Sequence, residues 1–357
     1  MLSVFVYHLI LLGGSAGTTL ADRALRAVGL AGWLGVDLFF VLSGFLITGI
    51  LLETRGRPGW LRRFYLRRAF RIIPAYYLAL ALLLAVQLTG REFNLASFGW
   101  TASWLTNILI GRDGWSALPT TMHHYWSLAV EEQFYLLWPF AVALLSRRAL
   151  LVLCAGLVVD ASLLRVGLAQ SSHMAASYVL LPARSDGLAV GAIFALLAQG
   201  EGGMEALARW LRWPIVAASA VIVTIVVVNR NFAADDTLVL GFGLAAVVIL
   251  AGCLMVLGMV RGQGGAWGRL LEARPLRLLG TYSYAIYLWH QPVILWLTAM
   301  GLSAAVLPRV AGSDLPGLLL LGAVAAAASL GLALLSWRLV EGPAAQLKER
   351  LTARPAP

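Results

Sequence analysis

Ionisable side chains interrupt several stretches of this sequence that are otherwise apolar. A charged group at membrane depth costs about 3 kcal/mol or more, so each such residue is a candidate functional residue unless it only pairs within the protein. The residues concerned are His8, Asp37, Glu131, Glu132, Asp160, Arg184, Asp186 and His290. An imidazole takes up a proton near neutral pH, and a carboxylate can orient an imidazole. The set therefore predicts proton-transfer chemistry inside an apolar surrounding.

The stretch WSLAVEEQFYLLWP, residues 126–139, carries two adjacent carboxylates. In a helix, Ser127, Glu131 and Tyr135 repeat every four residues and form one polar stripe. We therefore expect Glu131 to face a polar interior and Glu132 to point about 100° away, following the helical period. The alternative is that Glu131 is only a packing partner, for example of Arg184.

The composition indicates an integral membrane protein. Hydrophobic residues make up 60% of the 357 residues and charged residues 12%, whereas charged residues make up about a quarter of a soluble domain. The mean hydropathy is +0.83. Because a span needs about 20 apolar residues, we predict an all-α, polytopic transmembrane bundle of about ten helices, near residues 2–14, 31–53, 73–90, 125–145, 149–168, 177–199, 211–229, 237–260, 282–302 and 316–338.

Residues 95–111 contain Trp100, Trp104 and Asn107, and we expect an interfacial or re-entrant element there. The first segment has only about 13 residues, fewer than a span needs, and we expect the chain to begin inside that helix. We interpret residues 1–340 as a single membrane domain and residues 341–357 as a short cytoplasmic tail.

The net charge of +10 follows the expected topology. With the N-terminus inside, 18 basic residues fall in the inner loops and tail and 7 in the outer loops or at their edges, Arg91 and Arg165 among the latter. This bias is typical of a plasma-membrane protein with both termini in the cytoplasm. The charge therefore does not indicate a nucleic-acid partner.

Depth along the expected helices places the ionisable residues in one layer. At 1.5 Å per residue, His8, Asp37 and Glu131 lie roughly 9 Å from the outer ends of their segments, and Arg184, Asp186 and His290 lie deeper, about 10 to 14 Å from an end. We expect these residues to share a partly hydrated cavity.

Six ordered motifs resemble the acyltransferase 3 family over nearly the whole chain. They are VDLFFVLSGFLIT (36–48), RRAFRIIPAYY (67–77), WSLAVEEQFYLLWP (126–139), RSDGLAVGA (184–192), YSYAIYLWHQP (282–292) and VEGP (340–343). The family pattern also has an Arg about eleven residues before its helix-one His, a position that would precede Met1.

The resemblance implies a membrane O-acyltransferase that uses acyl-CoA, most commonly acetyl-CoA, as co-substrate, with no bound cofactor and no metal. The implied acceptor is a hydroxyl group of a glycan, a lipid-linked sugar or a secondary metabolite. Membrane lipid is the other expected partner. HHYW, residues 123–126, lacks the spacing of metal ligands.

The resemblance also implies site residues. His8 is the candidate catalytic base, or alternatively a covalent acyl carrier that would give ping-pong kinetics. Glu131 would orient His8 or bind the acceptor hydroxyl. Asp37, Arg184, Asp186 and His290 would line the acceptor cavity or form ion pairs. We expect Ser43 to bond back to its own helix rather than act as a nucleophile.

The basic stretch WLRRFYLRRAFR, residues 60–71, is expected to be a cytoplasmic loop. Arg68 and Arg71 are the candidate donor-binding residues, because a guanidinium contacts phosphate in a bidentate fashion. The alternative is that these arginines set the membrane topology and contact anionic lipid. Two other functional classes stay open: a multi-pass transporter of a small polar or acidic solute, since buried His, Asp and Glu also relay protons, and a nonenzymatic relative that acts as a membrane partner.

Overall fold

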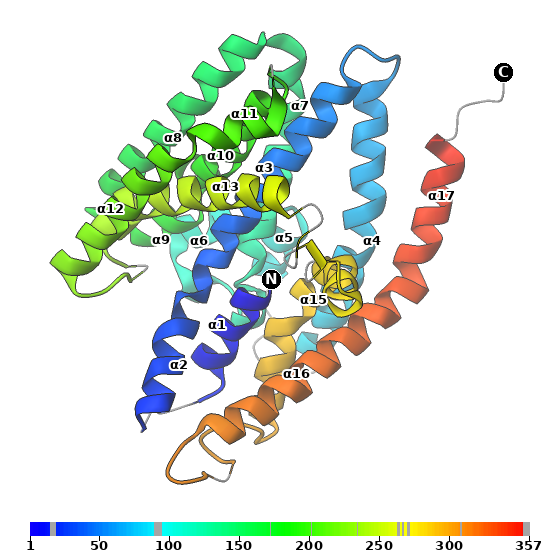
Figure 1. The fold of residues 1–357 in the computed structure, drawn as a ribbon. Coiled ribbons are helices and arrows are strands. Elements are labelled where there is room, and N and C mark those ends of the chain that lie inside the picture. Colours follow the sequence, from blue (N-terminus) through cyan, green and yellow to red (C-terminus); the bar gives the residue numbers. More distant parts are fainter. Residues whose placement is uncertain are drawn as a thin grey trace. The chain divides into compact units, whose positions relative to one another are not determined.

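The computed structural model describes residues 1–14, 19–88, 95–171, 173–200, 202–233, 235–262, 265, 268, 269, 272–307 and 309–352. Arg91 and the last five residues of the expected tail lie outside the described residues. The described residues are almost entirely helical and form no strand (Figure 1); a single bridge pairs Val310 with Ser313. The expected all-α fold is confirmed.

The chain forms two compact units. Unit 1 comprises Met1–Trp33, Arg57–Ala102 and Arg274–Pro357, and unit 2 comprises Leu34–Gly56 and Ser103–Ala273.

Unit 1 contains α1 and α2, a long helix α4, and the C-terminal helices. In it, α15 packs against α1 and α16, and α4 packs against α17. The bounds are α1 Leu2–Leu12, α2 Leu20–Leu30, α4 Trp60–Leu88, α5 Leu95–Ala102, α15 Arg274–Ala299, α16 Leu315–Ser336, the π-helical turn η5 Trp337–Glu341 and α17 Gly342–Thr352.

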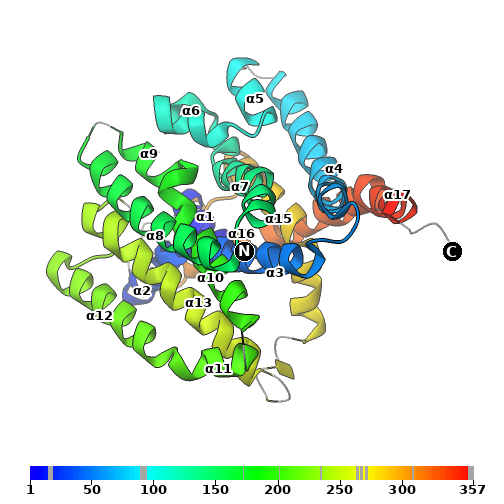
Figure 2. The ribbon, with the colours of Figure 1, turned by 90° about the horizontal axis from the view of Figure 1, so that it is seen from above.

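Unit 2 is centred on α10, which contacts α3, α8 and α13 and lies among them in Figure 2. The helices are α3 Gly35–Thr54, α6 Thr106–Asp113, α7 Tyr125–Leu144, α8 Arg147–Ala169, α9 Met174–Val179, α10 Leu181–Ala198, α11 Gly203–Trp210, α12 Arg212–Asn229 and α13 Leu244–Arg261. The turns η2 Trp115–Ala117 and η3 Thr120–Met122 precede α7, and the π-helical turn η4 Val239–Gly243 leads into α13.

Two glycines let α3 and α10 approach closely. A Cβ atom on Gly44 would lie 2.0 Å from the carbonyl oxygen of Leu188, and one on Gly191 would lie 2.0 Å from that of Val41. Small residues at a helix interface allow such close backbone contact in membrane proteins. The packing brings the buried polar residues of the two helices together.

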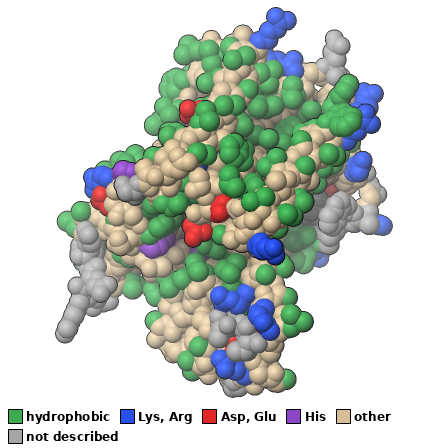
Figure 3. All heavy atoms as spheres, turned by 90° about the vertical axis from the view of Figure 1, so that its left-hand side faces the viewer, with side chains coloured by type: hydrophobic (Ala, Val, Ile, Leu, Met, Phe, Trp, Pro, Cys, Tyr) green, Lys and Arg blue, Asp and Glu red, His purple; other side chains and the backbone are tan. Residues whose placement is uncertain are grey.

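Seven helical stretches among the described residues are long and apolar enough to cross a membrane: Leu20–Thr54, Trp60–Leu88, Arg147–Ala169, Met174–Ala198, Arg212–Asn229, Val239–Arg261 and Leu315–Leu351. The helix α1 is shorter, and α7 and α15, although long enough, are not among these stretches. Hydrophobic side chains cover much of the face shown in Figure 3. These features fit the multi-pass bundle that we expected.

The structure corrects several expected boundaries. The basic stretch 60–71 is not a loop but the first three turns of α4, which continues through Pro74. Residues 20–30, expected to be loop, form α2, whose N-terminus has a Thr19–Asp22 capping box. Residues 95–111 form two short helices, and the segment 177–199 is divided at Leu180. The described part of the expected tail is helical.

Candidate functional site

A histidine pair lies in unit 1, between α1 and α15. His8 Nδ1 and His290 Nε2 are 2.8 Å apart, and the ring centroids are 5.0 Å apart. His290 is fully buried, and its Nδ1 atom donates a hydrogen bond to the carbonyl oxygen of Tyr287 at 2.6 Å. Two residues that the sequence analysis selected on separate helices are thus brought into direct contact.

The Tyr287 carbonyl defines the proton positions of the neutral pair. A carbonyl oxygen can only accept, so His290 carries its proton on Nδ1 and presents a lone pair at Nε2. His8 then donates its Nδ1 proton to His290, which leaves the His8 lone pair on Nε2. This is the protonation state that a general base requires.

Glu131 lies in unit 2 and belongs to a polar triad with Ser43 and Tyr135. Glu131 Oε1 accepts a hydrogen bond from Ser43 Oγ at 2.7 Å and another from the Tyr135 hydroxyl. Ser43 Oγ and the Tyr135 hydroxyl are themselves 2.7 Å apart. The expected back-bond of Ser43 to its own helix is therefore wrong, because the side chain contacts α7 instead.

The structure separates the two adjacent carboxylates of α7 as the helical period predicts. Glu131 is 6% exposed, whereas Glu132 is half-buried. Tyr135 shares the face of Glu131, but Ser127 donates to the carbonyl oxygen of His124. The polar stripe thus holds for Glu131 and Tyr135.

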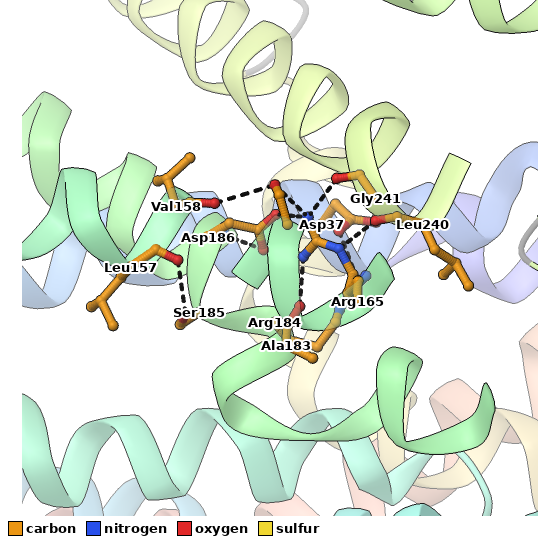
Figure 4. Close-up of polar contacts among 12 residues, drawn as sticks. Asp37, Leu157, Val158, Arg165, Ala183, Arg184, Ser185, Asp186, Leu240 and Gly241 are labelled. Carbon is orange, nitrogen blue, oxygen red and sulfur yellow. Dashed lines mark hydrogen bonds and ion pairs between the residues drawn. The ribbon is translucent and has the colours of Figure 1, made fainter. Parts of the chain in front are cut away.

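Four buried charges form two ion pairs in unit 2 (Figure 4). Arg184 Nη2 lies 2.7 Å from Asp37 Oδ1, and Arg165 Nη2 lies 2.8 Å from Asp186 Oδ2. The two arginines are 0% exposed and the two aspartates 1% exposed. Asp37, Arg184 and Asp186, which we expected to pair or line a cavity, lie in this one cluster.

Arg165 is the member of the cluster that the sequence analysis missed. We expected it at the outer edge of its segment, but its guanidinium is buried and donates to the carbonyl oxygens of Ala183, Leu240 and Gly241. Leu240 and Gly241 belong to the π-helical turn η4, and π-helical turns often occur at functional sites.

Arg184 also faces three aromatic rings. Its guanidinium carbon lies 5.1 Å from the ring centroid of Tyr178, 5.6 Å from that of Trp126 and 5.7 Å from that of Phe40. The buried Arg184 Nε and Nη1 and Asp37 Oδ2 have no hydrogen-bond partner in the structure. A buried polar group without a hydrogen-bond partner costs free energy, so a hydrogen-bonding partner at these three atoms would lower the free energy of the site.

The candidate donor residues lie on α4 in unit 1. Arg68 is half-buried and Arg71 is exposed, and residues three apart share one face of a helix. Arg71 interacts electrostatically with Glu341, which accepts a hydrogen bond from Ser336 Oγ at 2.7 Å. In the part of the chain that the structure describes, no group of three His, Cys, Asp or Glu side chains is arranged to hold a metal ion.

Comparison with known proteins relates the amino-acid sequence of this chain to one family. The family described as an acyltransferase domain matches residues 1–338. The putative peptidoglycan O-acetyltransferase YrhL of Bacillus subtilis is 32% identical over 75% of this chain and 45% of that protein. The peptidoglycan O-acetyltransferase OatA of Listeria monocytogenes is 28% identical over 74% of this chain and 45% of its own length.

The O-acetyltransferase OatA of Staphylococcus aureus is 26% identical over 75% of this chain and 47% of that protein. The chain therefore spans less than half the length of these curated relatives. No solved structure matches the chain significantly.

Proposed function

The chain belongs to the acyltransferase domain family, and from this premise we propose that it transfers an acetyl group from acetyl-CoA to a hydroxyl group of a cell-envelope glycan. The observation that carries the proposal is the His8–His290 pair, with its lone pair on His8 Nε2. The names of the relatives support acetyl as the acyl group and a glycan as the acceptor. The family match favours this enzyme over the transporter.

The proposed reaction needs a base for the acceptor hydroxyl. His8 Nε2 takes the hydroxyl proton while the hydroxyl oxygen attacks the thioester carbonyl carbon of acetyl-CoA. The C–S bond then breaks, the CoA sulfur leaves as a thiolate, and that thiolate takes the proton from cationic His8, which gives free CoA and restores the neutral base. His290 stabilises the cationic His8 by accepting its Nδ1 proton in a hydrogen bond.

Glu131 contributes an oriented carboxylate within this proposal. Its carboxylate accepts hydrogen bonds from Ser43 and Tyr135, which hold the side chain in one orientation. In that orientation we propose that it binds the acceptor hydroxyl.

We propose that Arg68 and Arg71 contact the phosphates of the donor from the cytoplasmic side, and that both chain termini are cytoplasmic.

The test is acetyl transfer by the purified protein in detergent, with radiolabelled acetyl-CoA and solubilised peptidoglycan fragments. Wild type should label the glycan and release one CoA for each acetyl transferred. Glu131→Gln should lower the rate at least about tenfold, because a neutral amide replaces the carboxylate. The matched control is Glu132→Gln, the neighbouring and more exposed carboxylate, which should retain wild-type activity.

The result against the proposal would be wild-type protein that neither labels the glycan nor releases CoA when both substrates are present. A burst of one CoA per enzyme without acceptor would support a covalent acyl-histidine in place of general base catalysis.

A further inference from the structure

Three aromatic rings in unit 2 form a row that ends at Arg184. The ring centroids of Trp115 and Tyr178 are 6.2 Å apart, and those of Tyr178 and Trp126 are 5.0 Å apart. The Arg184 guanidinium carbon is within 5.6 Å of both the Tyr178 and Trp126 centroids. We call Trp115, Tyr178 and Trp126 the aromatic row.

Exposure decreases along the aromatic row. Trp115 and Tyr178 are half-buried, Trp126 is 5% exposed and Arg184 is completely buried. The row thus connects partly accessible rings to the buried ion pair of Arg184 and Asp37. Each ring comes from a different element: η2, α9 and α7.

Trp115 follows the exposed Arg112–Asp113 ion pair in the chain and has the ring of His123 beside it. The ring centroids of Trp115 and His123 are 5.4 Å apart, and His123 Nε2 donates a hydrogen bond to the Leu118 carbonyl oxygen at 3.0 Å. Burial lowers the pKa of His123, although hydrogen bonds to the Leu118 and Trp115 carbonyls oppose this effect. His123 is therefore neutral at pH 7.

The inner end of the row offers both donors and an acceptor. Arg184 Nε and Nη1 are buried donors without a hydrogen-bond partner, and Asp37 Oδ2 is a buried acceptor without a hydrogen-bond partner. A ligand that fills all three positions carries oxygen acceptors together with a hydroxyl donor. Sugar hydroxyl groups and N-acetyl carbonyls have this combination.

The charge of the cluster selects against an anionic ligand. Arg165 and Arg184 are balanced by Asp37 and Asp186 in two ion pairs. An anion at the inner end would therefore lie in a neutral cluster and lose its hydration without a counter-charge. Aromatic faces combined with a neutral hydrogen-bonding cluster suit an uncharged sugar better than a phosphate.

We propose that the aromatic row, together with Arg184 and Asp37, binds sugar rings of the glycan acceptor. Trp115 and Tyr178 stack against the apolar faces of the rings, and the inner ring hydrogen-bonds to Arg184 and Asp37. The assignment rests on the proposed function for the identity of the ligand as acceptor, but binding itself can be measured without turnover.

The experiment is isothermal titration calorimetry of the full chain in detergent with the tetrasaccharide of N-acetylglucosamine. Trp115→Ala and Tyr178→Ala should each weaken binding about tenfold or more, the loss expected when one stacked ring is removed. Tyr178→Phe keeps the ring and should bind nearly as wild type does. The matched control is Trp210→Ala, an exposed tryptophan of the same unit outside the row.

A melting curve for each variant separates loss of the site from loss of the fold. If Trp115→Ala does not fold, Trp115→Leu, which keeps an apolar side chain but removes the ring, should weaken binding in the same way. Absence of tetrasaccharide binding by wild type, or equal binding by Trp115→Ala and wild type, would overturn the inference. Binding that depends on the row without any acetyl transfer would uphold the inference and contradict the proposed function. Acetyl transfer by a protein whose tetrasaccharide binding does not depend on the row would uphold the proposed function and overturn the inference.

Discussion

His8 Nδ1 lies 2.8 Å from His290 Nε2, although the two residues are 282 positions apart in the chain. The contact links the first helix of unit 1 to α15, and the Tyr287 carbonyl determines which His290 nitrogen can accept. His290 is therefore a positioning residue in our account, since it acts on the reaction through His8.

Replacing His290 should lower turnover without weakening substrate binding. His290→Phe removes the acceptor for the His8 Nδ1 proton, so we expect kcat to fall about 10²-fold, toward the contribution of a general base, with the KM for either substrate little changed. His290→Gln keeps an acceptor oxygen and should retain more activity than His290→Phe. Steady-state kinetics of both variants measure this, and equal losses in the two would argue for a merely structural histidine.

Removing one partner of the buried Arg165–Asp186 pair should destabilise the fold, mainly because the remaining charge is then buried without a counter-charge. Arg165→Met leaves Asp186 buried and unpaired, so we expect a loss of about 3–5 kcal/mol of stability. Thermal unfolding in detergent measures it. The double variant Arg165→Met/Asp186→Leu removes both charges and should recover much of the loss. No recovery would mean that the carbonyl contacts of Arg165, rather than its ion pair, determine the stability.

The close packing of α3 on α10 predicts that alanine substitutions at two glycines of α3 have different effects on stability. Gly44→Ala places a Cβ atom 2.0 Å from the Leu188 carbonyl oxygen, and overpacking of this kind typically costs about 1–3 kcal/mol. Gly49 has no neighbour within 4 Å of such an atom. Gly49→Ala should therefore leave the melting temperature unchanged or raise it slightly. Equal melting temperatures for the two variants would contradict this packing.

Donor binding predicts that Arg71 cannot be replaced by lysine. Arg71→Lys keeps the positive charge but loses the planar fork that contacts phosphate. We expect the KM for acetyl-CoA to rise about tenfold, as for the loss of one charge-assisted hydrogen bond, while the KM for the glycan stays the same. The control is Arg62→Lys, an exposed residue on the same helix. An unchanged KM in Arg71→Lys would leave topology and lipid contact as the role of Arg71.

Charge inside an apolar helix is conspicuous in the sequence, so most of the buried ionisable residues were selected, but Asp160 is exposed and Glu132 is half-buried. Asp37, Arg184 and Asp186 lie in one buried cluster of unit 2, and His8 meets His290 in unit 1, while the cavity shared by all of them stays a prediction. Arg165 escaped notice because it lies four residues from the end of α8, where an arginine is usually a topological signal. Its partners are carbonyls of a π-helical turn, which no side-chain pattern reveals.

Composition also hides helical structure in two places. The arginines of residues 60–71 lower the local hydropathy, so the first turns of α4 resembled a loop. The helix α2 is short and amphipathic, and Ser43 bonds to a residue 88 positions away. Contacts of this range depend on tertiary packing.

The most direct measurement of the central claim is the rate of acetyl transfer from acetyl-CoA to peptidoglycan fragments by His8→Ala. The control is His173→Ala, an exposed histidine outside the site. The account predicts that His8→Ala loses at least about 10²-fold in kcat, the contribution of a positioned general base, while His173→Ala matches wild type. A His8→Ala protein that folds and transfers acetyl at the wild-type rate would contradict it.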